Sequence, residues 1–393
     1  MYVDGPYAHI TGGAGGIATD PADFPFLTFA CEVGSQFSER IVFARISDRA
    51  GDERFRLPPD ARVIGLPDFG DLQQLPRVAR AGAATIRAFW QGLRDVDAVW
   101  VFGPHPFAIT LALLAKMRRK HVVLGVRQDT AEYFRSRSDS VQRSPSQIAA
   151  RIVDRIFRIL ARRTATTAVG TAIAASYGAP HPRVHVMTVS LMRDRDVAQA
   201  PSARDWGPGP INLLTVGRID REKNPLLLIR ALEKLNRSHP DRFHLTWVGT
   251  GPMADDVTRL VRDLGIEHLV RLPGFVPFGP ELIARYRDAH AFAHVALTEG
   301  VPAVLMEALA AGLPLVATDV GGVRAALRYG AVGLVIPADD LDALVTAIRS
   351  LDVDPTGRQE RAERGLALAR DETLEKETAR VGDFIRATSR AGR

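Results

Sequence analysis

Residues 298–320 read TEGVPAVLMEALAAGLPLVATDV, and this stretch does most to decide the fold. The apolar run just before it, residues 291–296, predicts a buried strand, residues 303–311 predict a helix, and residues 315–317 predict a second strand. Pro302 suits the first turn of that helix, because proline lacks an N–H that a helix start would leave unpaired. A strand, a helix and a second strand in this order are typical of a parallel sheet covered by helices.

The same alternation extends in both directions from this stretch. Upstream, residues 198–210 (AQAPSARDWGPGP) combine proline, glycine and small polar residues without periodicity, which indicates a linker. After the linker, the predicted strands are 211–216, 243–248, 269–272, 291–296, 315–317 and 333–336, and the predicted helices are 225–236, 253–264, 280–289 and 303–311. Before it, the predicted strands are 40–44, 98–102, 121–126 and 184–189, and the predicted helices are 77–94 and 109–117.

This pattern predicts an α/β chain with two doubly wound, Rossmann-like domains facing across a cleft. The N-terminal domain is expected over residues 1–197, the linker over 198–210 and the C-terminal domain over 211–372. A last helix, expected over 373–387, follows a second domain that is already complete. We therefore expect residues 373–393 to cross back to the N-terminal domain.

The bulk composition agrees with a folded chain of more than one domain. The 393 residues exceed one ordinary core, and 46% hydrophobic with 24% charged residues is usual for globular proteins. A single cysteine excludes an internal disulfide and fits a reducing compartment, so we expect a cytoplasmic location. The net charge of +6 is scattered, and we find no nucleic-acid recognition motif, so we expect no nucleic-acid partner. Residues 98–115 are uncharged but contain Gly103-Pro104-His105-Pro106, so we expect no membrane span.

Two carboxylates separated by seven residues, Glu299 and Glu307, are the strongest chemical signal. The first is expected in a loop after a strand, and the second inside the following helix. The amides of Ala303 and Val304 at the start of that helix would face an anion. Glu307 could then bind the sugar hydroxyls of a nucleotide, and Glu299 a second polyol. The alternative is that both are solvated acids.

A second signal follows the first strand of the C-terminal half, where residues 216–223 read VGRIDREK. Ligands of open parallel sheets bind at the carboxyl ends of strands, so Arg218 and Lys223 are well placed to hold a diphosphate. The alternative is a surface cluster in which both pair with Asp220 and Glu222. Further along, residues 247–252 read WVGTGP, and its glycines would allow backbone to approach a ligand closely.

Together these motifs resemble the C-terminal domain of the retaining glycosyltransferases of family 4, which have the GT-B fold. The resemblance covers about half of the chain. The matching positions are Gly217-Arg218 with Lys223, Val248-Gly249-Thr250-Gly251-Pro252, Gly274-Phe275-Val276, Glu299 with Glu307, Gly312-Leu313-Pro314-Leu315-Val316-Ala317-Thr318, and Gly321-Gly322.

The resemblance implies transfer of a sugar from a nucleoside diphosphate donor to an unidentified glycan, lipid-linked or small-molecule acceptor, with retention of configuration. It implies catalytic roles for Arg218, Lys223 and Glu299, with no protein general base, no essential metal and no cofactor besides the donor. The implied donor-binding residues are Gly217, Gly249, Gly251, Val276, Gly300, Val301, Ala303, Val304 and Glu307. Two alternatives remain, a nucleotide-sugar epimerase and a catalytically silent nucleotide-sugar-binding subunit.

The N-terminal half matches the family less well. The glycine-rich loop that touches donor and acceptor would comprise Gly12, Gly13, Gly15 and Gly16. Only Tyr2 and Val3 then remain for the first strand, which is either very short or cut by a late start. The family often places a histidine at the end of a strand facing the sugar. Here the strand over 121–126 runs into Arg127 instead, and His105 ends a different strand as a stand-in.

Three other patterns are set aside. Residues 13–18 fit a dinucleotide fingerprint with Glu39 as its acid, but the strand required before it is missing. The pairs Asp95/Asp97 and Asp352/Asp354 resemble metal-binding Asp-x-Asp motifs without partner ligands. Residues 148–163 predict a basic amphipathic helix that could lie weakly on the anionic inner face of a membrane. The expected arrangement is instead that its apolar face packs on the N-terminal sheet, with Arg151, Arg155 and Arg162 in water.

Overall fold

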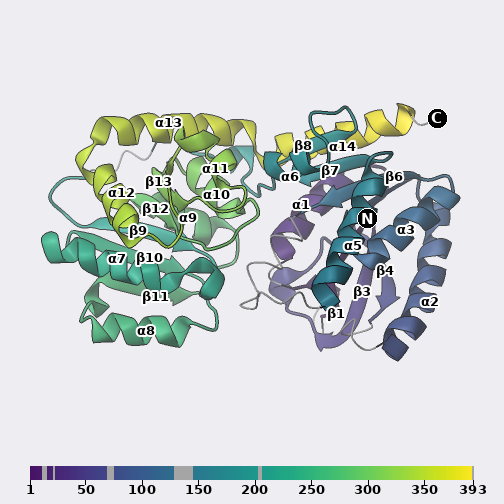
Figure 1. Cartoon of the computed structure of the whole chain (residues 1–393), viewed down its shortest axis with the longest axis horizontal. Coiled ribbons are helices and arrows are strands. Elements are labelled where there is room, and N and C mark those ends of the chain that lie inside the picture. The colour runs from purple at the N-terminus through teal and green to yellow at the C-terminus, as the bar shows by residue number, and fades with distance from the viewer. Residues whose placement is uncertain (11–15, 21–22, 69–74, 128–144, 202–205, 392–393) are drawn as a thin grey trace. The chain divides into compact units, whose positions relative to one another are not determined.

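The computed structural model describes residues 1–10, 16–20, 23–68, 75–127, 145–201 and 206–391. The chain divides into two compact units (Figure 1). Unit 1 comprises Met1–Val189 with Lys376–Arg393, and unit 2 comprises Ser190–Glu375. The division falls before the predicted linker because Met192 already belongs to the core of unit 2, where its carbonyl accepts a hydrogen bond from the Leu374 amide at 2.8 Å.

Within the described residues, unit 1 contains an eight-stranded sheet of order β4-β3-β1-β5-β6-β7-β8, with β2 paired antiparallel to β1 and the other neighbours parallel. Its strands are β1 Tyr2–His9, β2 Ile17–Thr19, β3 Ile41–Ala50, β4 Arg62–Pro67, β5 Ala98–Gly103, β6 His121–Val126, β7 Ala165–Val169 and β8 Val184–Met187. Its helices are α1 Phe24–Gly34, α2 Leu75–Gly92, α3 Pro106–Met117, α5 Pro145–Ala161, α6 Thr171–Ser176 and most of α14 Leu374–Ala391.

The expectation of a very short first strand is wrong. Strand β1 runs from Tyr2 to His9 and lies inside the sheet between β3 and β5. Pro6 lacks an N–H for the ladder, and the pairing with β3 shifts register between Tyr2 and Pro6. Irregularities of this kind are where a strand tolerates proline.

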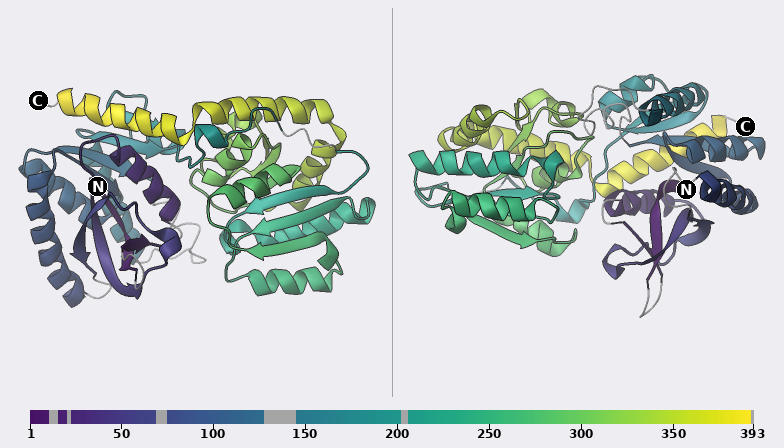
Figure 2. Two further views of the ribbon diagram at one scale, coloured as in Figure 1. Left: turned by 180° about the vertical axis from the view of Figure 1, so that it is seen from behind. Right: turned by 60° about the horizontal axis from the view of Figure 1, so that its bottom comes forward.

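Unit 2 is a doubly wound parallel sheet. Its order in the described residues is β11-β10-β9-β12-β13-β14, so the chain winds outward in both directions from β9. The strands are β9 Ile211–Val216, β10 Phe243–Val248, β11 Val270–Gly274, β12 Ala291–His294, β13 Leu315–Thr318 and β14 Leu334–Ile336. The helices are α7 Pro225–Ser238, α8 Ala254–Asp263, α9 Pro280–Asp288, α10 Ala303–Ala310, α11 Val323–Ala326, α12 Leu341–Val353 and α13 Pro355–Asp371. Figure 2 shows helices packed against the sheet of each unit.

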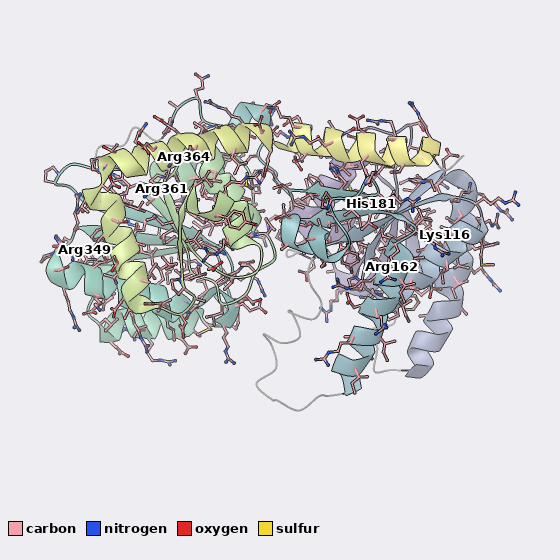
Figure 3. All side chains as sticks on the ribbon, turned by 45° about the horizontal axis from the view of Figure 1, so that its top comes forward. Lys116, Arg162, His181, Arg349, Arg361 and Arg364 are labelled. Atoms are coloured by element: carbon pink, nitrogen blue, oxygen red, sulfur yellow. The ribbon has the colours of Figure 1, made fainter. Side chains whose placement is uncertain are left out.

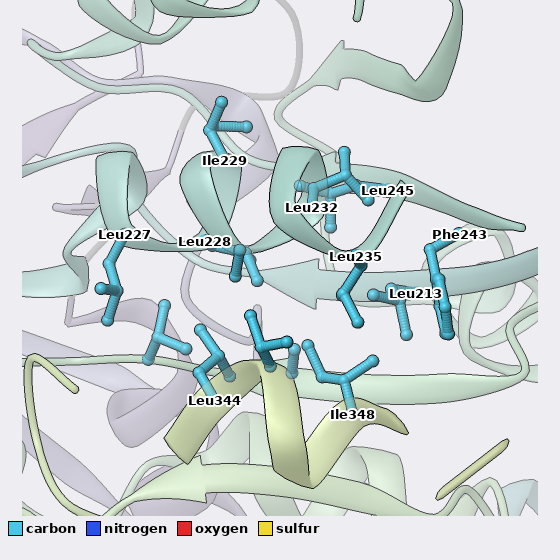
Figure 4. Packing of buried hydrophobic residues seen from close by; sticks show 14 of the residues in the cluster. Leu213, Leu227, Leu228, Ile229, Leu232, Leu235, Phe243, Leu245, Leu344 and Ile348 are labelled. Atoms are coloured by element: carbon cyan, nitrogen blue, oxygen red, sulfur yellow. The ribbon is translucent and has the colours of Figure 1, made fainter. Parts of the chain in front are cut away.

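Periodic leucines build the core of unit 2. In α7, Leu228, Leu232 and Leu235 recur at spacings of four and three residues and therefore share one buried face. This face belongs to a cluster with Leu344 and Ile348 of α12 and with side chains of β9 and β10 (Figure 4). Burying each such side chain contributes about 1.5–3 kcal/mol. The packing holds β9 and β10, and hence the loops that follow them, in place.

Helix α5 differs from its predicted packing. Its buried row includes Phe157 and Ala161, which are 0% and 4% exposed. Of the five apolar residues expected to pack on the sheet, Leu160 is partly buried against the core of unit 1, but Ile148, Ile152, Ile156 and Ile159 are 45–55% exposed. The helix packs on the core through Phe157, Leu160 and Ala161, and its isoleucine row faces outward. No helix among the described residues is long and apolar enough to cross a membrane, and residues 98–115 form β5 and α3.

Candidate functional site

The two chemical motifs of the C-terminal half meet at the switch point of the unit 2 sheet. Strands β9 and β12 are neighbours, yet the chain leaves them toward opposite edges of the sheet. Beyond their carboxyl ends lies the crevice where such sheets bind ligands. The amide of Leu297, after β12, donates to the carbonyl of Glu222, after β9, at 2.7 Å. Backbone contact therefore joins the loop of Lys223 to the loop of Glu299.

Glu299 is held by two nitrogen donors. The Lys223 ammonium donates to its Oε1, and His294 Nε2 lies 2.9 Å from the same oxygen. The three side chains are largely buried, with exposed fractions of 12%, 20% and 3% for Glu299, Lys223 and His294. Burial by itself raises the pKa of Glu299, but the charge of Lys223 and the His294 hydrogen bond outweigh it and lower this pKa to about 2. Glu299 is therefore an anion across the neutral range.

Arg218 is more exposed than Lys223. Its Nη2 lies 2.9 Å from Asp220 Oδ2 and 3.1 Å from Glu222 Oε2, and 55% of its side chain is exposed. Arg218 thus forms the surface ion pairs with Asp220 and Glu222 that the sequence left open as an alternative. Lys223 does not form these pairs, because its ammonium contacts Glu299. Because more than half of the Arg218 side chain is open to solvent, a phosphate could compete with these carboxylates for it.

Glu307 lies inside the unit. It is on α10 and is 5% exposed, and the hydroxyl of Tyr286, from α9, donates to its Oε2 at 2.7 Å. Burial raises the pKa of Glu307 to about 7, although the Tyr286 hydrogen bond opposes the shift. Glu307 and Glu299 are therefore not the solvated acids of the alternative interpretation. Glu307 is a carboxyl group that can change its charge near neutral pH.

Glycines bring the loops of the site together. A Cβ on Gly249 would lie 1.9 Å from the carbonyl oxygen of Gly217, and Gly249 has φ +150°. A Cβ on Gly321, at φ +51°, would lie 1.8 Å from the carbonyl oxygen of Glu299. The Gly322 amide donates to the Gly300 carbonyl at 2.8 Å in the same turn. The predicted role of Gly249 in donor contact stays a prediction, while its observed role is close packing of one loop on another.

The remaining predicted donor residues gather at the same edge of the unit 2 sheet. Pro302 occupies the N-cap of α10, and its side chain has no oxygen that could accept a hydrogen bond. The amides of Ala303 and Val304 at the start of the helix therefore have no side-chain cap from this residue. Each of the others follows the end of a strand: Gly217 follows β9, Gly249 and Gly251 follow β10, Val276 follows β11, and Gly300 and Val301 follow β12. Sequence reasoning missed His294 and Tyr286. His294 is the last residue of β12, and a polar residue at the carboxyl end of a strand could have indicated a site residue.

The predicted N-terminal residues belong to unit 1. Gly12, Gly13 and Gly15 lie outside the described residues, and the Gly16 carbonyl accepts from the Ile10 amide at 2.9 Å. His105 caps α3, because its Nδ1 accepts from the Phe107 amide at 3.3 Å. Arg127 pairs with Asp23 at 2.9 Å. These contacts give His105 and Arg127 structural roles, and their contact with a donor or acceptor stays a prediction.

The chain is similar to several known proteins. Residues 199–366 match the family model described as glycosyl transferases group 1. A GDP-mannose-dependent alpha-(1-6)-phosphatidylinositol monomannoside mannosyltransferase of Mycolicibacterium smegmatis is 32% identical over 279 residues, which cover 67% of this chain and 69% of that protein. A D-inositol 3-phosphate glycosyltransferase of Pseudarthrobacter chlorophenolicus is 32% identical over 216 residues, covering 53% of this chain and 50% of the relative. The chain thus spans about half the length of several curated relatives it matches.

Solved structures resemble the whole chain. The sucrose-phosphate synthase of Thermosynechococcus elongatus has a TM-score of 0.72 at 16% identity, covering 95% of this chain and 94% of that one. HepE of Anabaena, solved with UDP and glucose, has a TM-score of 0.67 at 17% identity, with coverage of 97% and 98%. At these identities the likeness concerns the fold alone. It confirms the predicted fold class of two Rossmann-like domains of the GT-B type.

Proposed function

We propose that this chain, which belongs to the family of glycosyl transferases group 1, moves a sugar from a nucleoside diphosphate donor to a hydroxyl acceptor with retention of configuration. The observation that carries the proposal is the pairing of Lys223 with Glu299 at the switch point of unit 2. It brings a cation and a carboxylate from sequence-distant motifs to the edge where such a sheet binds nucleotides.

The proposed roles follow from where charge develops during transfer. The bond between the anomeric carbon and a phosphate oxygen breaks, and its electron pair stays on that oxygen. Lys223, Arg218 and the amides at the start of α10 would stabilise the growing negative charge. The acceptor oxygen forms the new bond, and its proton passes to the leaving phosphate. Glu299, an anion at neutral pH, would accept hydrogen bonds from sugar hydroxyls, and no protein group acts as general base.

The acceptor we propose is a phosphorylated polyol, free or as part of a lipid headgroup. Support comes from relatives named for D-inositol 3-phosphate and for phosphatidylinositol monomannoside. An epimerase or a silent binding subunit would release no glycosylated product. Mass spectrometry of the reaction mixture therefore separates these alternatives from transfer.

A thermal-shift screen tests the donor. We expect one class among UDP-, GDP- and dTDP-sugars to raise Tm, because a ligand at 100 times its Kd stabilises the folded state by about 2.7 kcal/mol. The hit then serves as donor in a transfer assay with inositol phosphates, run with and without EDTA, since we propose no resident metal. Absence of a shift with every donor would contradict the proposed site, and loss of transfer in EDTA would contradict metal independence.

We also propose that the protein is cytoplasmic and attaches peripherally to the inner face of a membrane through α5. The four exposed isoleucines of this helix support the proposal, and the exposed Arg151, Arg155 and Arg162 would face anionic headgroups. We expect more sedimentation with anionic than with neutral vesicles at low salt, and a loss of at least about fivefold in Ile152→Glu. Leu113→Glu, at a comparably exposed residue of α3, is the control. Equal sedimentation with both vesicle types would exclude this attachment.

A further inference from the structure

A strongly basic pocket lies in unit 1. Its volume is about 660 Å³, and it lies where β5, β6, β7 and β8 begin. This is the edge of the sheet opposite to the carboxyl ends of its strands. Among the described residues that line it, six side chains are lysine or arginine, and Asp97 is the single carboxylate. The six are Lys116, Arg118, Arg119, Lys120, Arg163 and Arg183, and together they define what we call the basic pocket.

The fold brings these cations together from three places in the chain. Helix α3 ends in a turn in which the Arg118 amide donates to Leu114 O at 3.1 Å and the Arg119 amide to Lys116 O at 2.9 Å. Arg119 adopts φ +56°, a left-handed conformation that ends the helix. Arg163 follows the end of α5, and Arg183 directly precedes β8. The cluster is therefore built by packed elements of one unit (Lys116 is labelled in Figure 3).

The positive charge of the basic pocket is not neutralised within the described part of the chain. None of its six cations forms an ion pair with a described carboxylate, whereas most ionic groups of α13 and α14 have partners. Arg118 stacks at 4.0 Å over the ring of Trp90, and its buried Nε has no hydrogen-bond partner. Burial also lowers the pKa of Lys116, with no carboxylate opposing the shift. Gathering like charges in this way costs free energy that a bound anion would recover.

We propose that the basic pocket binds a phosphate-bearing ligand at a second site, in a different unit from the candidate donor site. Guanidinium and ammonium groups are the preferred protein partners of phosphate, and several converging on one hollow favour a ligand with more than one negative charge. A volume of about 660 Å³ is in the range of small-molecule sites. The ligand is either a free phosphorylated molecule or the phosphorylated headgroup of a lipid.

Titration calorimetry with inorganic pyrophosphate tests the second site. We expect two binding events in the parent protein, one in the candidate donor site and one in the basic pocket. The double variant Arg119→Glu/Arg163→Glu should keep the first and weaken the second by tenfold or more, because charge reversal removes two partners and adds repulsion. Arg87→Glu, at an exposed arginine of α2 outside the pocket, is the matched control and should keep both.

Lys223→Ala separates this proposal from the proposed function. It should remove the event in the donor site and leave the event in the basic pocket. A protein that binds one pyrophosphate, lost in the double variant and kept in Lys223→Ala, would support the basic pocket and contradict the diphosphate role of Lys223. An isotherm unchanged by Arg119→Glu/Arg163→Glu would overturn the basic pocket as an anion site.

Vesicle binding then separates the two sources of phosphate. If the ligand is a lipid headgroup, the double variant should sediment less with phosphatidylinositol vesicles than Arg87→Glu does, and pyrophosphate should release the parent protein. If it is a free molecule, sedimentation should be the same in both variants while pyrophosphate affinity still differs. Ile152→Glu should retain the binding of pyrophosphate in either case, because Ile152 lies on the exposed face of α5 and does not line the basic pocket.

Discussion

Replacing Lys223 by alanine is expected to lower kcat by about 10²–10³, in addition to weakening donor binding. The diphosphate carries more negative charge in the transition state than in the bound donor, and a positioned cation acts mainly on that difference. Steady-state kinetics with the donor found by thermal shift measure both parameters. A fall in kcat and kcat/KM together would show an interaction made in the transition state.

The control for this variant must account for Glu299. Removing Lys223 leaves the buried Glu299 carboxylate with His294 as its remaining described partner. The low pKa of Glu299, about 2 against an ordinary 4.5, contributes stability above pH 4.5 that is lost as the pH falls through 2. Lys223→Ala should therefore have a lower Tm at pH 7, and kinetics are to be measured well below it. Lys234→Ala breaks an exposed pair with Asp342 in the same unit and should leave kcat unchanged.

Arg218 provides an independent test of the same charge argument. Arg218→Ala should lower kcat in the same direction, and Arg218→Lys should restore it only in part, because an ammonium cannot reproduce a two-pronged contact with phosphate. If Arg218 only pairs with Asp220 and Glu222, its loss would lower stability and leave turnover unchanged. Folded Lys223→Ala protein that turns over like the parent would contradict the diphosphate role of Lys223.

The bounds of three strands could be predicted from the sequence to the residue. Strands β6, β9 and β10 have the bounds expected for residues 121–126, 211–216 and 243–248. Strand β7 was missed, because its sequence ATTAV has two central threonines and no apolar run. Both threonines are fully buried, and Thr167 Oγ1 accepts a hydrogen bond from Trp100 Nε1 at 3.0 Å. That partner lies 67 residues away, so local sequence could not show that the polar groups are satisfied.

The candidate site could be predicted only as far as its motifs extend. Spacing selected Lys223, Glu299 and Glu307, and the structure brings the first two into contact across 76 residues of sequence. Tyr286 and His294 escaped because each lies in an ordinary helix or strand pattern, and only the packing of α9 and β12 directs them onto the carboxylates. The same packing decides the charge of each acid. Burial raises the pKa of both glutamates of the motif. Lys223 and His294 outweigh it for Glu299, whose pKa is about 2, whereas the single Tyr286 hydrogen bond does not for Glu307, whose pKa is about 7.

Replacing Glu307 by alanine is expected to weaken the binding of free UDP or GDP by tenfold or more. The proposed partners are the two ribose hydroxyls, and hydrogen bonds to a charged acceptor contribute about 1.5–3 kcal/mol. Calorimetry measures the affinity directly, and unchanged binding would remove Glu307 from the site. Tyr286→Phe, which removes the hydroxyl 2.7 Å from Glu307 Oε2, should have a smaller effect. In the proposed role, the phenol would position the carboxylate and would not bind the ribose itself.

The raised pKa of Glu307 predicts that donor affinity increases with pH. In the proposed role, ribose hydroxyls would donate to the ionised carboxylate, so binding would favour the deprotonated form. Affinity for the intact nucleotide sugar should therefore rise between pH 6 and 8, by up to about tenfold per pH unit below the pKa of about 7. The intact donor is the probe because its diphosphate has no group that titrates in this range. Glu307→Gln cannot ionise and should bind with a flat pH profile.

Stability should change with pH in the opposite direction from donor affinity. The folded protein holds a proton on Glu307 up to about pH 7, whereas the unfolded chain releases it near 4.5. This contribution to the free energy of unfolding is therefore complete below pH 4.5 and is lost as the pH rises through 7. Glu307→Gln should make the dependence of Tm on pH shallower between 5 and 7.5. A variant with flat donor binding but the parent's pH dependence of Tm would assign the buried proton to another group, whereas loss of both dependences together places it on Glu307.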